Sequence, residues 1–276
     1  MAMVPQAYID AVVSIGVENN NDITWIGTGF FVTKKLEVNK YQPFLVSNKH
    51  IFENKEIVYI RLKQRNGGGL SIIPIKLIVD GVKQYSEHPN SKIDIAVILI
   101  NGSRIMENNL NFSFFNIDDD SLTTEEFLEA GGNEGSGIFM LGFPMGLVDV
   151  NSIAPICRTG CIARIDKTEI RDTKNILLDI QNFPGNSGSP IISKPELVSV
   201  SGTKTLKKCV LLGVIHSYIP YQETLVNSQT GRTVEIRSEN SGIAKANPVE
   251  FIKEVVAMEF DKYYPNGFAD FEEENI

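Results

Sequence analysis

The sequence predicts an all-β protein built from barrels, with a helix near its C-terminus. Short apolar runs rich in Val, Ile and Phe recur along most of the 276 residues, and Gly, Asn, Asp and Pro separate them. β-Branched residues in runs of this length are typical of strands. Long segments of helical period, which a parallel α/β fold needs between its strands, do not alternate with these runs. We therefore expect antiparallel sheets that close into barrels.

The predicted elements follow from these runs in chain order. The apolar runs expected as strands are residues 11–17, 29–33, 44–47, 57–62, 72–78, 95–100, 138–141, 176–180, 190–192 and 209–215. Residues 122–130 are expected as a short acidic helix. Residues 248–260 place apolar side chains on one helical face, with Asn247 as the N-cap and Pro248 as the first helical residue. The chain therefore ends in a docked helix.

Composition divides the chain into four parts. Residues 1–117 are expected as an N-terminal β-barrel and residues 138–247 as a C-terminal β-barrel. Residues 118–137, rich in Asp, Glu and Gly, separate the two blocks of strands and predict an acidic surface connector. Residues 248–276 form the helix and tail of the same unit.

Charge and cysteine usage exclude several classes of protein. The chain has 34 acidic and 26 basic side chains, a net charge of −8, and no cluster of Lys and Arg, so we expect no nucleic-acid partner. The N-terminus has no run of about 18 apolar residues, which argues against a membrane partner. The odd, sparse set of Cys157, Cys161 and Cys209 favours a reducing, cytoplasmic location. These thiols are too few for a zinc site, so neither a metal nor another cofactor is expected.

The clearest chemical motif is the loop at residues 184–190, PGNSGSP. Glycines beside a serine let the backbone approach a substrate carbonyl, so the amides of Gly185 and Ser187 can converge on an oxyanion while Ser187 Oγ attacks. A serine nucleophile needs a base, and the histidines of the chain are His50, His88 and His216.

Position distinguishes these histidines. His50 follows an apolar run and lies where a strand ends, whereas His88 lies in a polar loop and is expected to be exposed. Asp94 precedes a strand that is apolar throughout, and orienting an imidazole would give its carboxylate a partner. Asp80 is the competing carboxylate. The sequence thus predicts a catalytic triad of His50, Asp94 and Ser187.

The order of these residues and five local motifs resemble the chymotrypsin/trypsin-like serine proteases, with most similarity to HtrA/Deg-like bacterial peptidase domains without a PDZ domain. The motifs are Gly27-Thr28-Gly29-Phe30, the segment 45–50 (LVSNKH), Asp94-Ile95-Ala96-Val97, the segment 142–146 (GFPMG), and the segment 186–190 (NSGSP). The resemblance implies two six-stranded antiparallel β-barrels with the triad between them. It also implies an oxyanion hole at Gly185 and Ser187.

The resemblance further implies a substrate pocket formed by Gln181, His216 and Ser217. Gln181 takes the position of the pocket base, and an uncharged side chain there disfavours Lys or Arg substrates. His216 resembles the histidine of Gly-x-His motifs that bind Gln or Glu, with one extra residue in the strand. One residue turns a side chain to the opposite face unless a bulge absorbs it. Three roles therefore remain open for His216: substrate specificity, support of the triad, and packing alone.

The function expected from the sequence is serine endopeptidase activity through an acyl-enzyme, with a protein or peptide as substrate. The alternative is a protease-like regulatory or peptide-binding module that needs an activating protein partner. A third possibility, an esterase, would use the same triad. The physiological substrate, the preferred residue before the cleaved bond, the oligomeric state and the activating signal do not follow from the sequence.

Overall fold

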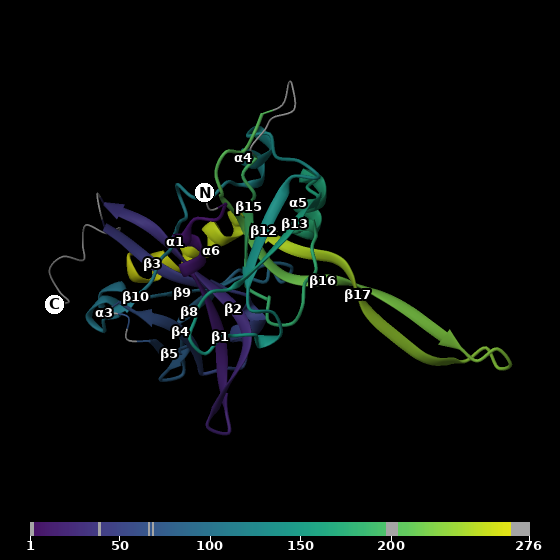
Figure 1. Ribbon diagram of the computed structural model, residues 1–276, viewed down its shortest axis with the longest axis horizontal. Helices are drawn as coiled ribbons and strands as arrows, with labels where there is room; N and C mark the ends of the chain where they lie inside the picture. The colour runs from purple at the N-terminus through teal and green to yellow at the C-terminus, as the bar shows by residue number, and fades with distance from the viewer. Residues whose placement is uncertain (1–2, 38–39, 66, 68, 197–203, 266–276) are drawn as a thin grey trace.

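A computed structural model describes residues 3–37, 40–65, 67, 69–196 and 204–265. The chain forms two β-rich halves, with helix α6 (Val249–Tyr263) packed against both (Figure 1). A long two-stranded arm extends away from the second half.

The first half is an open, largely antiparallel sheet rather than the predicted six-stranded barrel. Its strands pair in the order β10-β4-β1-β2-β3-β9-β8, with β5 added to β4 and β11 added in parallel to β2. The strands are β1 (Val12–Asn19), β2 (Asp22–Glu37), β3 (Lys40–Ser47), β4 (Ile57–Gln64), β5 (Leu70–Lys76), β8 (Tyr85–Glu87), β9 (Ala96–Leu99), β10 (Leu110–Asn111) and β11 (Phe115–Asn116).

The sheet stays open because nothing joins β5 to β8. The chain between them forms the short hairpin of β6 (Ile78–Val79) and β7 (Val82–Lys83), which pairs only with itself among the described strands. The barrel prediction is therefore wrong for this half. Sequence patterns identified the strands here, but closure depends on which edges meet.

The second half is a closed six-stranded barrel, as predicted. Its strands are β12 (Gly137–Gly142), β13 (Ile156–Arg164), β14 (Ile176–Asp179), β15 (Pro190–Ser193), β16 (Leu211–Val226) and β17 (Thr233–Pro248). The apolar runs did not predict β13 and β17, because both carry many polar and charged side chains. β16 also continues well beyond its predicted end.

The helices are short except for α6. They are α1 (Gln6–Asp10), α2 (Lys49–Phe52), α3 (Gly102–Glu107), α4 (Thr124–Glu129), the 3₁₀ turn η1 (Pro144–Gly146), α5 (Lys167–Thr173) and α6. α4 lies inside the predicted acidic helix and begins with a capping box between Thr123 and Glu126. α6 begins one residue later than predicted, because Pro248 and not Asn247 is its N-cap.

Helix α6 closes a core shared by both halves. Its buried Val249, Ile252 and Val256 join one apolar cluster with Val97 of β9 and Leu141 of β12. Burying one face of a helix against both sheets fixes the position of one sheet relative to the other. Separate clusters fill the first sheet and the barrel.

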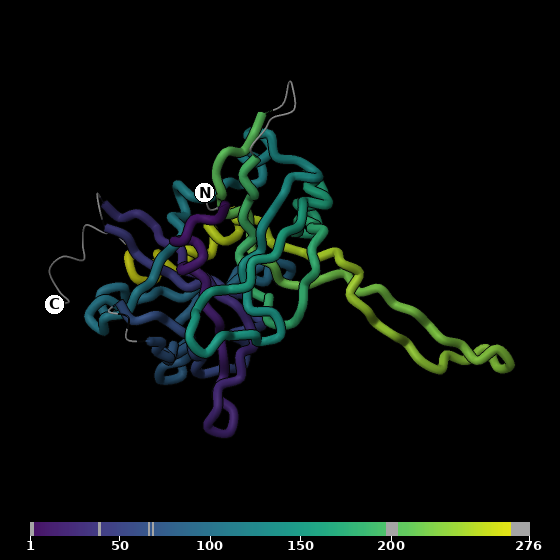
Figure 2. The backbone as a smooth tube through the Cα atoms, viewed as in Figure 1, coloured from purple at the N-terminus to yellow at the C-terminus, as the bar shows by residue number. Residues whose placement is uncertain are grey.

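The arm is the outer part of β16 and β17, and we define it as residues 218–239. All of its residues are exposed, and the tube view shows it as a ribbon clear of the body of the molecule (Figure 2). No helix in the described part of the chain is long and apolar enough to cross a membrane.

Candidate active site

His50 and Asp94 meet because of the register between β3 and β9. Ser47 at the end of β3 pairs with Ala96 at the start of β9, so α2, which follows β3, lies beside the residues before β9. His50 Nδ1 is 2.6 Å from Asp94 Oδ2, and the His50 backbone N–H donates to Asp94 Oδ1 at 3.3 Å. The carboxylate thereby orients the imidazole and leaves Nε2 available. Asp80, the competing carboxylate, lies in the β6–β7 turn.

The Asp94 carboxyl is held ionised by its surroundings. Burial favours the neutral acid, but the hydrogen bond and charge of His50 outweigh it, so the pKa of Asp94 lies below its ordinary value. The Asp94 backbone is also fixed: Asn48 Nδ2 donates to its carbonyl at 2.6 Å, and its N–H donates to Asn247 Oδ1 at 2.9 Å.

Ser187 lies where two tight turns join. In the first, the Asn186 N–H donates to Phe183 O at 3.0 Å around Pro184 and Gly185, and Gly185 has a φ of +93°, as a type II turn requires. In the second, the Ser189 N–H donates to Asn186 O at 2.9 Å. Ser187 is therefore presented by backbone geometry and remains partly exposed.

Thr28 of β2 attaches this serine loop to the first half. Its N–H donates to Ser187 O at 2.9 Å, and its Oγ1 donates to Gly185 O at 2.7 Å. Thr28 O in turn accepts from Ser47 Oγ at 2.7 Å, at the end of the strand that leads to His50. Thr28 thus lies between the serine loop and the strand that precedes the base.

Gly188 shows how closely the loop approaches β2. It has a φ of +87°, and a Cβ there would lie 2.0 Å from Thr28 O and 2.5 Å from Ser47 Oγ. Only glycine fits this backbone conformation and this space.

Two backbone amides of the loop are free. Among the described residues, neither the Gly185 N–H nor the Ser187 N–H donates to an acceptor, whereas the Asn186 N–H between them is used in the turn. Free amides on either side of an occupied one, next to a serine hydroxyl, are what an oxyanion hole requires. Both amides therefore have no acceptor within the described part of the chain.

The chain is similar to solved structures of protease domains at low sequence identity. No family model and no curated protein sequence matches the chain. Among solved structures, the apo protease domain of MamO from Magnetospirillum magneticum superposes with a TM-score of 0.49 at 14% identity, covering 90% of this chain and 96% of that one. The HtrA-type protease AlgW with a tripeptide gives 0.48 at 16%, covering 94% of this chain and 62% of that one.

A second AlgW structure, with a decapeptide, superposes with a TM-score of 0.46 at 15% identity and covers 93% of this chain and 66% of that one. The structural similarity to HtrA-type protease domains thus comes with low sequence identity. The chain spans about three fifths to two thirds of the AlgW chains.

His216 lies on β16 of the closed barrel, near Asp94. The pairing of β16 with β17 shifts between Ile215 and Ser217, so an irregularity falls on His216 itself. His216 Nε2 is 2.7 Å from Asn175 Oδ1. Burial lowers the pKa of His216 to about 4, although the nearby charge of Asp94 acts in the opposite direction. The imidazole is therefore neutral near pH 7.

A chain of amides connects His216 to Asp94. Asn247 Nδ2 donates to Lys174 O at 2.8 Å and to Asn175 Oδ1 at 3.3 Å, while its Oδ1 accepts from the Asp94 N–H. The left-handed Lys174 at the end of α5 positions Asn175. Sequence analysis assigned no role to Asn175 and treated Asn247 only as a helix cap, because short amide side chains have no distinctive pattern.

Two predicted pocket residues lie outside this chain of amides: Gln181 follows the end of β14, and Ser217 lies on β16. Gln181 is exposed, and its Nε2 is 3.5 Å from where a Cβ on Gly242 would lie. Ser217 is partly buried and pairs with Lys245 of β17. Among the described residues, no hydrogen bond links Gln181 with His216.

His88 corrects the expectation of an exposed histidine. It is only 8% exposed, its Nε2 is 2.8 Å from Glu254 of α6, and its ring contacts Phe251. Packing of α6 over the loop buries it, and a local polar sequence gives no sign of that. Lys49 Nζ fixes the same loop by donating to His88 O.

Cys157, Cys161 and Cys209 are free thiols. Within the described ranges, no group of His, Cys, Asp and Glu is arranged to hold a metal ion.

Proposed function

We propose that this chain is a serine endopeptidase that acts through His50, Asp94 and Ser187. The observation that carries the proposal is the hydrogen bond of 2.6 Å between His50 Nδ1 and Asp94 Oδ2, formed beside a serine turn with two free amides. A carboxylate on Nδ1 directs the other imidazole nitrogen to act as a base.

The proposed reaction follows from this arrangement. Ser187 Oγ attacks the scissile carbonyl while His50 Nε2 takes the hydroxyl proton, and the amides of Gly185 and Ser187 stabilise the oxyanion. His50 then gives the proton to the leaving amine, and an acyl-enzyme remains. Water, deprotonated by His50, hydrolyses the ester and restores Ser187. Asp94 stays ionised throughout and stabilises the imidazolium.

The proposed substrate is a protein or peptide, with Gln181 and Ser217 in its binding pocket. An uncharged Gln181 leaves a basic side chain unpaired there and so disfavours cleavage after Lys or Arg. The contacts of His216 favour a role in supporting Asp94 over contact with substrate, because its Nε2 is used by Asn175. We also propose a reducing cytoplasm as the site of action.

The test is labelling with a fluorophosphonate probe, together with cleavage of a peptide library. Ser187→Ala should abolish both, since the probe needs the nucleophilic hydroxyl. Ser189→Ala is the matched control: it removes a hydroxyl from the same loop that is fully buried and cannot meet the probe. Labelling that persists in Ser187→Ala would reject the assignment.

A second candidate function is a protease-like module that becomes active only with a protein partner. One observation favours it: among the described residues, no hydrogen bond joins Ser187 Oγ to His50, although the His50–Asp94 bond is formed. A partner that moves the loop slightly would complete the triad. Isolated protein that resists the probe, but is labelled at Ser187 in a lysate of its source cells, would support this candidate.

A further inference from the structure

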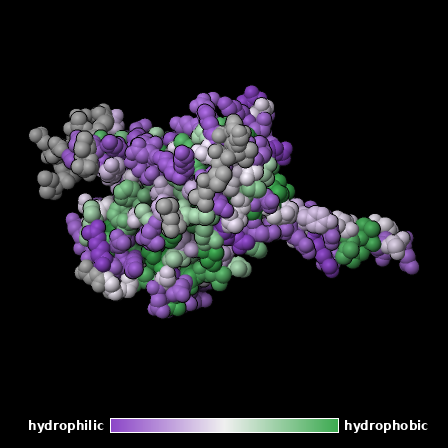
Figure 3. All heavy atoms as spheres, turned by 45° about the horizontal axis from the view of Figure 1, so that its top comes forward, coloured by the Kyte–Doolittle hydropathy of each residue, from purple (hydrophilic) through white to green (hydrophobic). Residues whose placement is uncertain are grey.

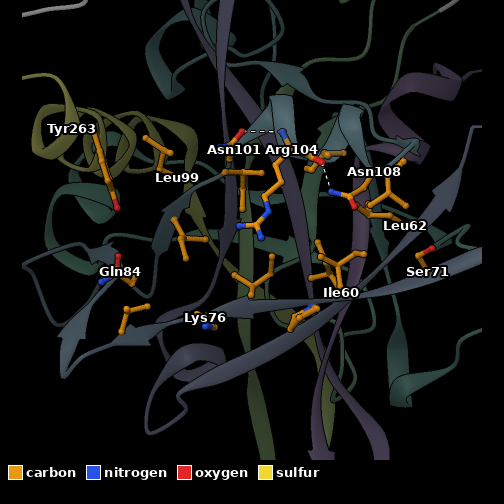
Figure 4. Close-up of a pocket in the computed structure, with 18 residues that line it drawn as sticks. Ile60, Leu62, Ser71, Lys76, Gln84, Leu99, Asn101, Arg104, Asn108 and Tyr263 are labelled. Carbon is orange, nitrogen blue, oxygen red and sulfur yellow. Dashed lines mark hydrogen bonds between the residues drawn. The ribbon is translucent and has the colours of Figure 1, made fainter. Parts of the chain in front are cut away.

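Arg61 of β4 is a buried arginine near the connection between η1 and β13. Its side chain is only 6% exposed. Its neighbours Ile60 and Leu62 line an apolar groove of about 620 Å³ in the first half (Figure 4). Successive side chains of a strand point to opposite faces, so Arg61 points to the other face of the sheet.

The charge of Arg61 is buried without an ion-pair partner. Hydrophilic side chains are spread over the visible surface of the molecule (Figure 3), but among the described residues Arg61 and Glu259 are the only Arg, Lys, Asp or Glu side chains that are buried. Glu259 pairs with Lys262 at 2.9 Å, whereas Arg61 forms no ion pair with any described residue, and its Nη1 has no hydrogen-bond partner among them. The charge of the exposed Asp149 favours the cation, but burial is the stronger effect and lowers the pKa of Arg61. Burying a charge in this way lowers stability, so stabilisation of the fold does not by itself explain Arg61.

The contacts of Arg61 connect the first sheet to residue 149. Its Nη2 donates to Asp149 O, and its guanidinium carbon lies 5.7 Å from the centre of the Trp25 ring. The ring lies across Gly16 of β1, where a Cβ would come within 2.8 Å of Trp25 Cε3. Trp25 also contacts η1, because a Cβ on Gly146 would lie 2.7 Å from Trp25 O. A guanidinium held against an aromatic ring directs its donor to Asp149 O in a fixed direction.

The connection from η1 to β13, residues 147–155, has few other attachments. Val150 is 86% exposed, and Val148 packs against the shared core. Among the described residues, the bond from Arg61 to Asp149 O is the one hydrogen bond that joins this connection to the first half. Loss of that bond would therefore loosen the connection and the turn before it.

That turn, η1, lies directly against the serine loop. The Met145 N–H donates to Pro184 O at 2.5 Å. A Cβ on Gly185 would lie 2.3 Å from Phe143 O, so only glycine lets the loop approach η1 this closely. The free Gly185 N–H therefore takes its position from η1.

We propose that Arg61 is a positioning residue for the candidate oxyanion hole. It holds Asp149 on the first sheet, which keeps η1 in place, and η1 in turn fixes the Gly185 N–H that binds the oxyanion. The inference rests on the proposed function, since an oxyanion forms only if Ser187 attacks a carbonyl. The link from Arg61 to η1 can be measured without catalysis.

The kinetic test compares Arg61→Met and Arg61→Lys with the wild type in peptide cleavage. Met keeps most of the length of the side chain but cannot donate to Asp149 O. Removing one oxyanion-hole donor costs about 10²- to 10³-fold in kcat, so a displaced donor should lower kcat at least about tenfold and leave KM unchanged. Arg61→Lys retains a donor and should recover part of that loss.

Arg104→Met is the matched control. The Arg104 side chain is exposed and extends from α3 toward the apolar walls of the groove (Figure 4). Only its backbone forms hydrogen bonds with described residues, namely Asn101 and Asn108. This variant should cleave peptides as the wild type does.

Amide hydrogen exchange, followed by NMR, measures the link without catalysis. In a Ser187→Ala background, Arg61→Met should speed exchange of the Met145 N–H, the donor to the serine loop, at least about tenfold. The Phe31 N–H, which is hydrogen-bonded in the core of the first half, should exchange at its original rate.

The outcomes separate this inference from the proposed function. A wild-type chain that neither cleaves peptides nor reacts with a fluorophosphonate would reject the proposed function, and the Met145 exchange rate would still show whether Arg61 holds η1. An active chain in which Arg61→Met leaves kcat or the Met145 rate unchanged would overturn the inference. A rise in KM alone would mean that Arg61 acts on substrate binding, and faster exchange at Phe31 as well would mean that it only stabilises the fold. Either result also overturns the inference.

Discussion

Asn247→Ala should destabilise the protein and disturb the candidate triad together. The Asn247 side chain is fully buried and makes three hydrogen bonds, with the Asp94 N–H, Lys174 O and Asn175 Oδ1. Each buried hydrogen bond contributes about 1 kcal/mol, so their joint loss should lower the free energy of unfolding by about 3 kcal/mol. Because Asp94 loses its fixed backbone position, peptide cleavage should fall as well.

The assay is urea unfolding followed by circular dichroism, with the free energy extrapolated to water. Asn108→Ala is the control, since this exposed amide makes one local bond, to Arg104 O, and should change stability by less than about 0.5 kcal/mol. An Asn247→Ala protein as stable as that control would show that the amide chain does not join the two halves.

Asn247→Asp distinguishes the effect of Asn247 on Asp94 from its contribution to packing. The carboxylate still accepts from the Asp94 N–H but cannot donate to Lys174 O, and it adds a negative charge beside Asp94. That charge should raise the pKa of Asp94. The stability that ionised Asp94 contributes should then be lost at a higher pH as the solution is acidified, measured by unfolding at a series of pH values, a change that loss of packing alone would not cause.

Three further predictions concern the serine loop and His216. Thr28→Val keeps the shape of the side chain but removes the hydroxyl that bonds to Gly185 O and the Phe143 N–H. Peptide cleavage should fall at least about tenfold, and the free energy of unfolding should fall by about 2 kcal/mol. An unchanged kcat/KM would argue against a role of Thr28 in positioning the serine loop. Gly188→Ala forces a Cβ to within 2.0 Å of Thr28 O, so fluorophosphonate labelling should be lost; a labelled variant of native stability would contradict the close approach. His216→Gln should flatten the acid dependence of stability, measured by unfolding at a series of pH values. The pKa of His216 is about 4 in the folded protein and 6.5 in the unfolded chain. The unfolded chain therefore binds the proton first as the pH falls, so the contribution of the neutral imidazole is complete above about pH 6.5 and is lost toward pH 4. The loss amounts to at most about 3 kcal/mol in the free energy of unfolding. An unchanged slope in that window would show that His216 is not the titrating group.

Local sequence patterns predicted much of the fold. Apolar runs located most strands of both halves, and the helical spacing near the C-terminus predicted α6 to within a few residues. Periodicity works here because it reports which face of a segment is buried. The search for continuous apolar runs missed β13 and the arm, because polar and charged side chains interrupt the apolar ones in these partly or fully exposed strands.

Local sequence also predicted some features of the candidate site but not others. The serine loop and the positions of His50 and Asp94 at strand ends follow from local sequence. Their 2.6 Å contact, the buried His88 and the amide chain through Asn247 depend on strand register and on the packing of α6.

The sequence by itself determined most of the strands, the acidic balance and the candidate residues for acyl transfer, because each of these depends on residue types within a short segment. Only the tertiary structure decided that the first sheet stays open, that His216 faces Asn175, and that the arm extends free of the body. Those features depend on which edges and side chains meet across segments distant in the chain. Local composition does not predict these long-range contacts, because a contact stabilises the protein only when both segments are packed together.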